Sequence, residues 1–186
     1  MKEIDATFTS PELIALKALI GQEFKCIGGP EVPDFLVSDS FVIGTSSSAV
    51  EISAEVKAHH VDPGSEEFSK LIIDVPDDEY LDKTLKSGNM YLLDRRNLIT
   101  GISIVRETLE SFEEGVASWL LRSDVALVIH LVKGDIVIRQ VSLSVEAIAA
   151  EYVDEFTLSV FEKPSNRFEN ELFPSLAPEF EIISMH

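Results

Sequence analysis

Two consecutive apolar runs in the second half of the chain place the strongest limit on its fold. Residues 125–132 read VALVIHLV, residues 136–143 read IVIRQVSL, and a short Lys-Gly-Asp segment separates them. Runs rich in β-branched and aliphatic side chains on either side of a glycine-containing turn predict a β-hairpin. The first run is apolar on both faces, which is typical of a strand covered on both sides. We therefore expect it near the middle of a sheet.

The register of this hairpin depends on its turn. A two-residue turn at Gly134-Asp135 would be of type II′, because glycine at the first central position takes the positive φ that this turn requires. It would pair Lys133 with Ile136 and His130 with Arg139. Since a neighbouring Arg139 disfavours the charged form of His130, this register favours a neutral, structural histidine over a catalytic one.

Three segments carry the signals of helices. Ser10 is placed to cap a helix over residues 11–20, Asp77 or Asp78 one near 78–87, and Ser144 one over 145–156. The third has the clearest apolar stripe, at positions 145, 148, 149, 152, 153 and 156. Such a stripe must be buried, so we expect this helix to lie on the sheet formed by the hairpin before it.

Elsewhere the pattern is that of strands. Residues 49–58 alternate apolar and polar side chains, which predicts a strand with one buried and one exposed face. Residues 107–121 fit both a helical stripe and a hairpin that turns at 113–115, and we favour the hairpin. The predicted fold class is α+β: a mainly antiparallel sheet of meanders and hairpins, open or partly closed into a barrel, with a few short covering helices.

The length of 186 residues predicts one α+β domain over residues 1–162, with a subdivision near 76–88 as the alternative. Residues 163–186 are polar and contain prolines at 174 and 178. We expect this C-terminal tail to run over the surface or to be mobile.

Charge is the largest departure from an average composition. The chain has 15 Lys and Arg against 33 Asp and Glu, a formal net charge of -18. This excludes nucleic acid as an expected partner, because a polyanion requires a clustered basic face. Residues 62–82 hold eight acids against Lys70 alone. Asp77, Asp78 and Glu79 at their centre are our candidate residues for binding a basic partner protein, and the alternative is that the acidity serves only solubility.

The sequence also bears on the compartment. Cys26 is the single cysteine, so no intramolecular disulfide can form. The chain carries no basic-then-apolar leader, and its longest apolar run is too short to cross a bilayer as a helix. We expect a cytoplasmic protein without a membrane partner.

Candidate chemistry is sparse. His59, His60 and Asp62 are the only close group of possible ligands, at the end of the alternating strand. Because neighbouring strand residues point to opposite faces, His59 and His60 cannot bind one ion within a strand, and we expect neither a metal nor a cofactor. No nucleophile elbow, phosphate-binding loop or paired-cysteine motif is present.

The favoured function is therefore that of a non-enzymatic protein–protein interaction module for a basic partner, such as an inhibitor, an immunity-type protein or an adaptor. One alternative is a small-molecule-binding protein or enzyme with its site near His59, His60 and Asp62. The other is a structural assembly component. The pattern does not determine an oligomeric state or a specific ligand.

Overall fold

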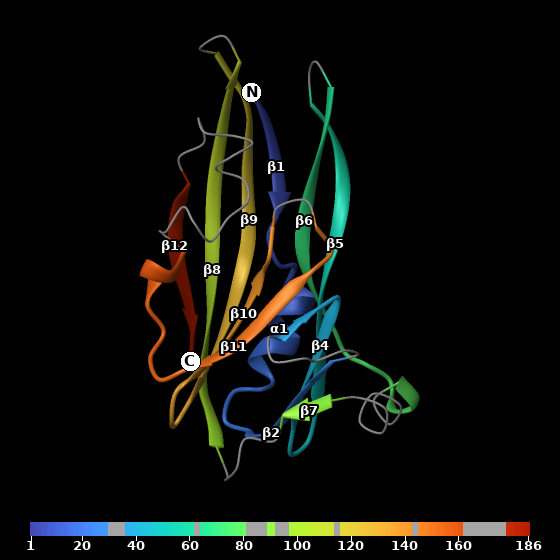
Figure 1. The fold of residues 1–186 in the computed structure, drawn as a ribbon, viewed down its shortest axis with the longest axis vertical. Helices are drawn as coiled ribbons and strands as arrows, with labels where there is room; N and C mark the ends of the chain where they lie inside the picture. Colours follow the sequence, from blue (N-terminus) through green and yellow to red (C-terminus); the bar gives the residue numbers. More distant parts are fainter. Residues whose placement is uncertain are drawn as a thin grey trace.

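The structure, a computed structural model, describes residues 1–29, 36–61, 64–80, 89–91, 97–113, 116–142, 145–161 and 178–186 (Figure 1). Its elements in chain order are β1 (Lys2–Ala6), α1 (Ser10–Lys17), β2 (Glu23–Gly29), β3 (Leu36–Ser38), β4 (Ser40–Thr45), β5 (Ala49–Val61), β6 (Gly64–Asp74), β7 (Asn89–Tyr91), β8 (Asn97–Glu113), β9 (Val116–Leu131), β10 (Asp135–Gln140), β11 (Ile148–Val153), the 3-10 helix η1 (Leu158–Val160) and β12 (Glu179–Met185).

The predicted mainly antiparallel sheet is confirmed, but the helices among the described residues are too few and too short to define an α+β class. Nine strands follow one another in the order β3-β11-β10-β9-β8-β2-β4-β5-β6, while β1, β7 and β12 pair beside this path. The pairing of β1 with β9 is parallel, and the path of the described strands does not close into a barrel. The path folds into two layers that meet where β2 pairs with the start of β8 (Figure 1).

The predicted central strand is confirmed. Residues Val125–Ile129 of β9 are at most 1% exposed. Strand β8 pairs along one edge of β9, so β1 and β10 share its other edge, β1 beside residues 119–123 and β10 beside 126–130. Burial on both faces explains why this strand is apolar throughout.

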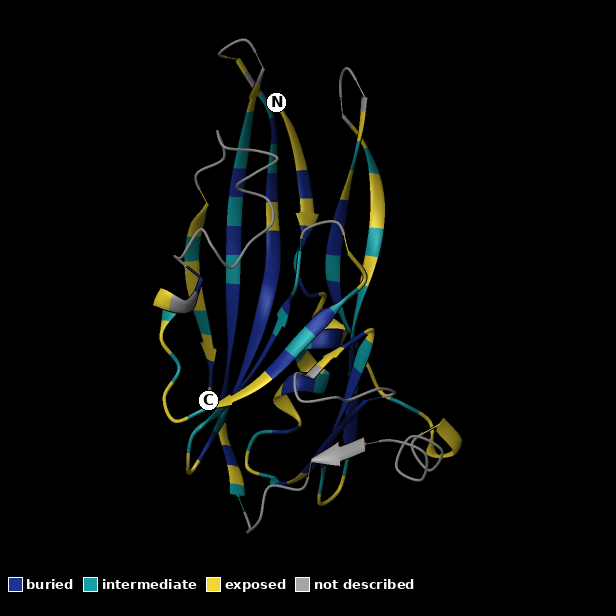
Figure 2. Ribbon diagram, in the orientation of Figure 1, coloured by how far each residue is buried: buried dark blue, intermediate teal, exposed yellow. Residues whose placement is uncertain are grey.

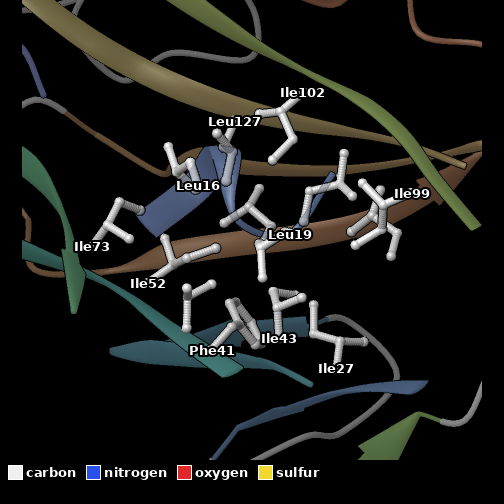
Figure 3. Close-up of a cluster of buried hydrophobic side chains, with 14 of the residues drawn as sticks. Leu16, Leu19, Ile27, Phe41, Ile43, Ile52, Ile73, Ile99, Ile102 and Leu127 are labelled. Atoms are coloured by element: carbon white, nitrogen blue, oxygen red, sulfur yellow. The ribbon is translucent and has the colours of Figure 1, made fainter. Parts of the chain in front are cut away.

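One apolar core fills the space between the two layers. Leu16 and Leu19, in and just after α1, lie among side chains of β4, β5, β6, β8 and β9 (Figure 3). On the opposite face of β8, β9 and β10, Phe161 and its neighbours cover a second cluster that includes Ala126 and Val128. Figure 2 shows the resulting band of buried residues along β8 and β9. Both faces of the central strands are thus covered by the chain itself.

The predicted helix over 145–156 is wrong, because residues 148–153 form β11. Ile148 and Ala150 alternate with the less buried Ala149 and Glu151, so the same letters also fit a strand with one core-facing side. Strand β11 pairs with β10 from Asp135 to Gln140. Backbone groups along that edge of β10 need partners, and this requirement outweighs the helical stripe.

The first predicted helix is confirmed with different bounds. Hydrogen-bonded turns replace its last residues, 18–20, and its N-cap is Thr9 rather than Ser10. Of the second, near 78–87, residues 78–80 are helical and the rest lies outside the described residues. Residues 107–113 and 116–121 belong to the β8–β9 hairpin, which confirms the preferred interpretation of that segment.

The predicted hairpin is confirmed over residues 125–140, but its predicted register is wrong. Three residues, 132–134, connect β9 and β10, and His130 pairs with Asp135 rather than with Arg139. Gly134 has a φ of 71° and stands last in the loop, not first in a two-residue turn. The Leu131 backbone N–H donates to the Gly134 carbonyl oxygen at 3.1 Å, so the chain turns at Val132-Lys133, two positions before the predicted turn. Gly134 takes its positive φ directly after this turn rather than within it.

The predicted domain division stays a prediction. Residues 81–88 of the possible boundary and residues 163–177 of the predicted tail lie outside the described residues. The last part of that tail forms β12, which pairs antiparallel with β8 from Glu179↔Thr108 to Met185↔Ile102.

Candidate functional site

The candidate acidic surface lies at the base of the β5–β6 hairpin. The register of these two strands places Glu51 directly opposite Asp74. Cross-strand partners stand about 5 Å apart at their Cβ atoms, and like charges in this position are destabilising. Asp74 is exposed and Glu51 is half-buried, so both carboxylates reach the surface.

The segment after β6 brings the predicted residues to the same place. The Tyr80 backbone N–H donates to Asp77 Oδ1 at 2.7 Å, which caps the short helical turn at 78–80. The Tyr80 hydroxyl donates to Glu51 Oε1 at 2.5 Å and so holds this turn beside β5. Asp77, Asp78 and Glu79 are all exposed. We call Glu51, Asp74, Asp77, Asp78 and Glu79 together the acidic patch.

The lysines of this hairpin are engaged by other carboxylates. Lys57 Nζ lies 2.9 Å from Glu55 Oε2, and Lys70 Nζ lies 3.7 Å from Glu12 Oε2. No further Lys or Arg occurs in β5 or β6. The strands beneath the acidic patch therefore supply it with no free counter-charge.

The second predicted group, His59, His60 and Asp62, lies only in part within the described residues. His59 is half-buried with its ring 6.0 Å from that of Phe68, whereas His60, the next residue of β5, is exposed. Burial, together with the charges of Lys2 and Lys57, lowers the pKa of His59. Asp62 lies outside the described residues, and within them no three potential metal-ligating side chains gather. This candidate stays a prediction.

Sequence analysis missed a third group, a chain of hydrogen bonds across three adjacent strands. Ser103 Oγ of β8 lies 2.8 Å from His130 Nε2 of β9, and His130 Nδ1 lies 2.9 Å from Asp135 Oδ1 at the start of β10. The second carboxylate oxygen, Asp135 Oδ2, accepts the Phe156 backbone N–H at 2.8 Å. We call Ser103, His130 and Asp135 the serine–histidine–aspartate chain.

The reason for this omission is the hairpin register. A turn at Gly134-Asp135 would place Arg139 opposite His130, whereas the observed turn places Asp135 there. In the β8–β9 pairing, Gly101 is the direct partner of His130. Ser103 follows two residues later on β8 and therefore lies on the same face of the sheet as His130. No local motif joins Ser103 to His130, since 27 positions separate them. A turn at Val132-Lys133, two positions before the predicted one, is what places Asp135 opposite His130.

Comparison with known proteins adds no assignment: no protein-family model, no curated protein and no solved structure matches the chain. In the part of the chain that the structure describes, no helix is long and apolar enough to cross a membrane.

Proposed function

We propose that the protein is an interaction module that binds a basic partner protein through the acidic patch. It would act as an inhibitor, an immunity-type protein or an adaptor, and would work in the cytoplasm. The observation that carries the proposal is the pairing of Glu51 with Asp74 beside the exposed Asp77, Asp78 and Glu79.

Physical reasoning supports this choice over solubility alone. Scattered surface acids maintain solubility without facing one another, whereas directly opposed carboxylates lower stability. A basic partner would neutralise this repulsion on binding, and the patch would also accelerate its approach. The charge of the whole chain repels polyanions, so nucleic acid and anionic membrane surfaces remain unsuitable partners.

The alternatives gain less support. The His59, His60 and Asp62 proposal lacks a converging third ligand among the described residues. An assembly role has no observation of its own, although β6 and β3 end the path of described strands and could pair with further strands.

A capture experiment from native lysate tests the proposal. The bait is the wild-type chain, a patch variant (Asp77→Asn, Asp78→Asn, Glu79→Gln) and a control variant (Asp154→Asn, Glu155→Gln, Glu179→Gln). The control changes three exposed acids near η1 and β12, on the far side of the sheet from β6 (Figure 1). Both variants lose the same amount of negative charge, so only the location of the change differs.

We expect the wild type and the control to retain a basic protein at low salt, and the patch variant to lose most of it. Moderate salt should weaken retention in all three, because exposed charges are screened. Equal retention by the two variants would refute the acidic patch as the binding surface.

A further inference from the structure

The serine–histidine–aspartate chain has the connectivity that activates a hydroxyl nucleophile. A serine hydroxyl is a weak nucleophile until an adjacent base can take its proton, and the base must be oriented by a third group. Here the 2.8 Å contact joins the hydroxyl to Nε2 of the imidazole, and the 2.9 Å contact joins Nδ1 of the same ring to a carboxylate. The order of atoms is that of a Ser-His-Asp triad.

The directions of these hydrogen bonds follow from the partners. An ionised carboxylate only accepts, so His130 Nδ1 carries the proton and donates it to Asp135 Oδ1. In the neutral ring Nε2 then presents a lone pair, and Ser103 Oγ donates to it. The Phe156 N–H fixes the other oxygen of Asp135 and so keeps the carboxylate oriented towards the ring. This is the tautomer that a general base requires.

Exposure limits what can reach the serine. Ser103 is 3% exposed, whereas the side chain of His130 is 29% exposed and that of Asp135 is 13% exposed. A large group would be excluded from Ser103, while the partly open imidazole can pass a proton to a departing alcohol. Ser184 of β12 stands directly opposite Ser103, with the two Oγ atoms 3.2 Å apart. Because Ser103 donates to His130, Ser184 can donate to Ser103, and a hydroxyl in this position can turn to a developing oxyanion.

From this geometry we propose that Ser103, His130 and Asp135 form an acyl-transfer site that accepts a small acyl group from an ester. Ser103 Oγ bonds to the carbonyl carbon, its proton passes to His130 Nε2, and the carbonyl π electrons move to oxygen. When the C=O bond re-forms, the ester C–O bond breaks and the alcohol takes the proton from Nε2. Water then attacks the acyl-serine in the same manner, which releases the acid and restores Ser103. Ser103 and His130 are catalytic residues in this scheme, and Asp135 is a positioning residue.

p-Nitrophenyl acetate is a suitable probe, because its acetyl group is small and its leaving group is coloured. We expect the wild-type chain to release nitrophenolate and to carry one acetyl group on Ser103, located by mass spectrometry after rapid acid quench. Ser103→Ala should remove the adduct. Asp135→Asn should lower the acetylation rate at saturating ester by about 100-fold or more, the usual contribution of general-base catalysis, without raising the half-saturating ester concentration.

Ser159→Ala is the matched control, because Ser159 is exposed on η1 and lies outside the chain of hydrogen bonds to His130. It should acetylate as the wild type does, and circular dichroism should show that all variants are folded. Two results would overturn the proposal: a folded wild type that carries no acetyl group on Ser103, or acetylation of Ser103 that is equally fast in Asp135→Asn. If Asp135→Asn does not fold, the wild type is treated instead with methanesulfonyl fluoride, whose small sulfonyl group matches the small acyl group proposed for this site. Failure of this reagent to label Ser103 of the wild type would equally overturn the proposal.

Discussion

At the scale of single residues, Glu12 joins the start of α1 to strand β6. Its Oε2 accepts the Thr9 backbone N–H at 2.6 Å and the Thr9 hydroxyl at 2.7 Å, and its Oε1 accepts the Ile73 N–H at 3.1 Å. Burial alone would raise the pKa of this 8%-exposed residue, but these donors and the charge of Lys70 outweigh it and lower the pKa. The ionised carboxylate is therefore the form that the folded state prefers.

Replacing Glu12 by Gln should destabilise the protein by about 1–3 kcal/mol at pH 7, because an amide cannot accept all of these hydrogen bonds. A carboxyl whose folded-state pKa is lowered stabilises the fold above its unfolded pKa of about 4.3, and this contribution is lost as the pH falls through the folded value. Urea unfolding should therefore show a gap between wild type and variant that is constant from about pH 7 to 5 and narrows below about pH 4. Equal unfolding free energies at pH 7 would contradict this account of Glu12.

The site residues differ in how far the sequence predicts them. Asp77, Asp78 and Glu79 could be found because a local excess of charge is visible in the letters alone. Ser103, His130 and Asp135 could not, since their contacts depend on two cross-strand registers. The observed β9–β10 register differs from the predicted one by four positions. Such an even shift keeps every side chain on its face of the sheet, but it changes the cross-strand partner of His130 from Arg139 to Asp135.

At the scale of elements, the β9–β10 hairpin shows which features the sequence determines. Two-sided burial follows from the apolar run itself, whereas the register follows from one glycine: Gly134 has a positive φ, and a Cβ there would come within 2.7 Å of the Val153 carbonyl oxygen. Strand β11 could not be predicted from its own letters, because residues 148–153 satisfy both periodicities. They form a strand because the backbone groups along the edge of β10 need hydrogen-bond partners, and β11 supplies them.

The central position of β9 gives a direct prediction. Ile129 is 0% exposed and belongs to the core between the layers. Ile129→Ala should destabilise the fold by roughly 2–5 kcal/mol, because it removes buried methyl groups and leaves a cavity. Glu55→Ala on the exposed part of β5 is the comparison, and should change stability by no more than about 0.5 kcal/mol. An unchanged urea midpoint for Ile129→Ala would mean that β9 is not a core strand.

At the scale of the whole molecule, an ion pair with a buried carboxylate fixes the N-terminal segment to the large sheet. Asp124 is fully buried and accepts from Arg106 Nε at 2.7 Å and from the Phe8 backbone N–H at 2.7 Å. Its partner Arg106 also approaches Glu181 of β12 at 3.8 Å, and the hydrogen bond to Asp124 raises the pKa of the Arg106 guanidinium. Chain ends that are distant in sequence thus meet at one polar contact between β8 and β9.

The acidic patch lies on β5, at the end of β6 and on the turn that follows β6. The interaction proposal requires that its charge act locally and not merely as part of the total of -18. A local charge acts mainly on the association rate of a basic partner and on its salt dependence. If only the total charge of the chain mattered, the patch and control variants would slow the association of the basic partner equally.

The association rate of the captured basic protein therefore tests the central claim most directly. It is measured for wild type, patch variant and control variant at ~0.01 M and ~0.15 M salt, where the Debye length is about 30 Å and about 8 Å. We predict that the patch variant associates several-fold more slowly than the control at the lower salt, that the difference shrinks at the higher salt, and that all three proteins have similar thermal midpoints. Equal association rates for the patch and control variants at ~0.01 M salt would contradict the proposed role of Asp77, Asp78 and Glu79.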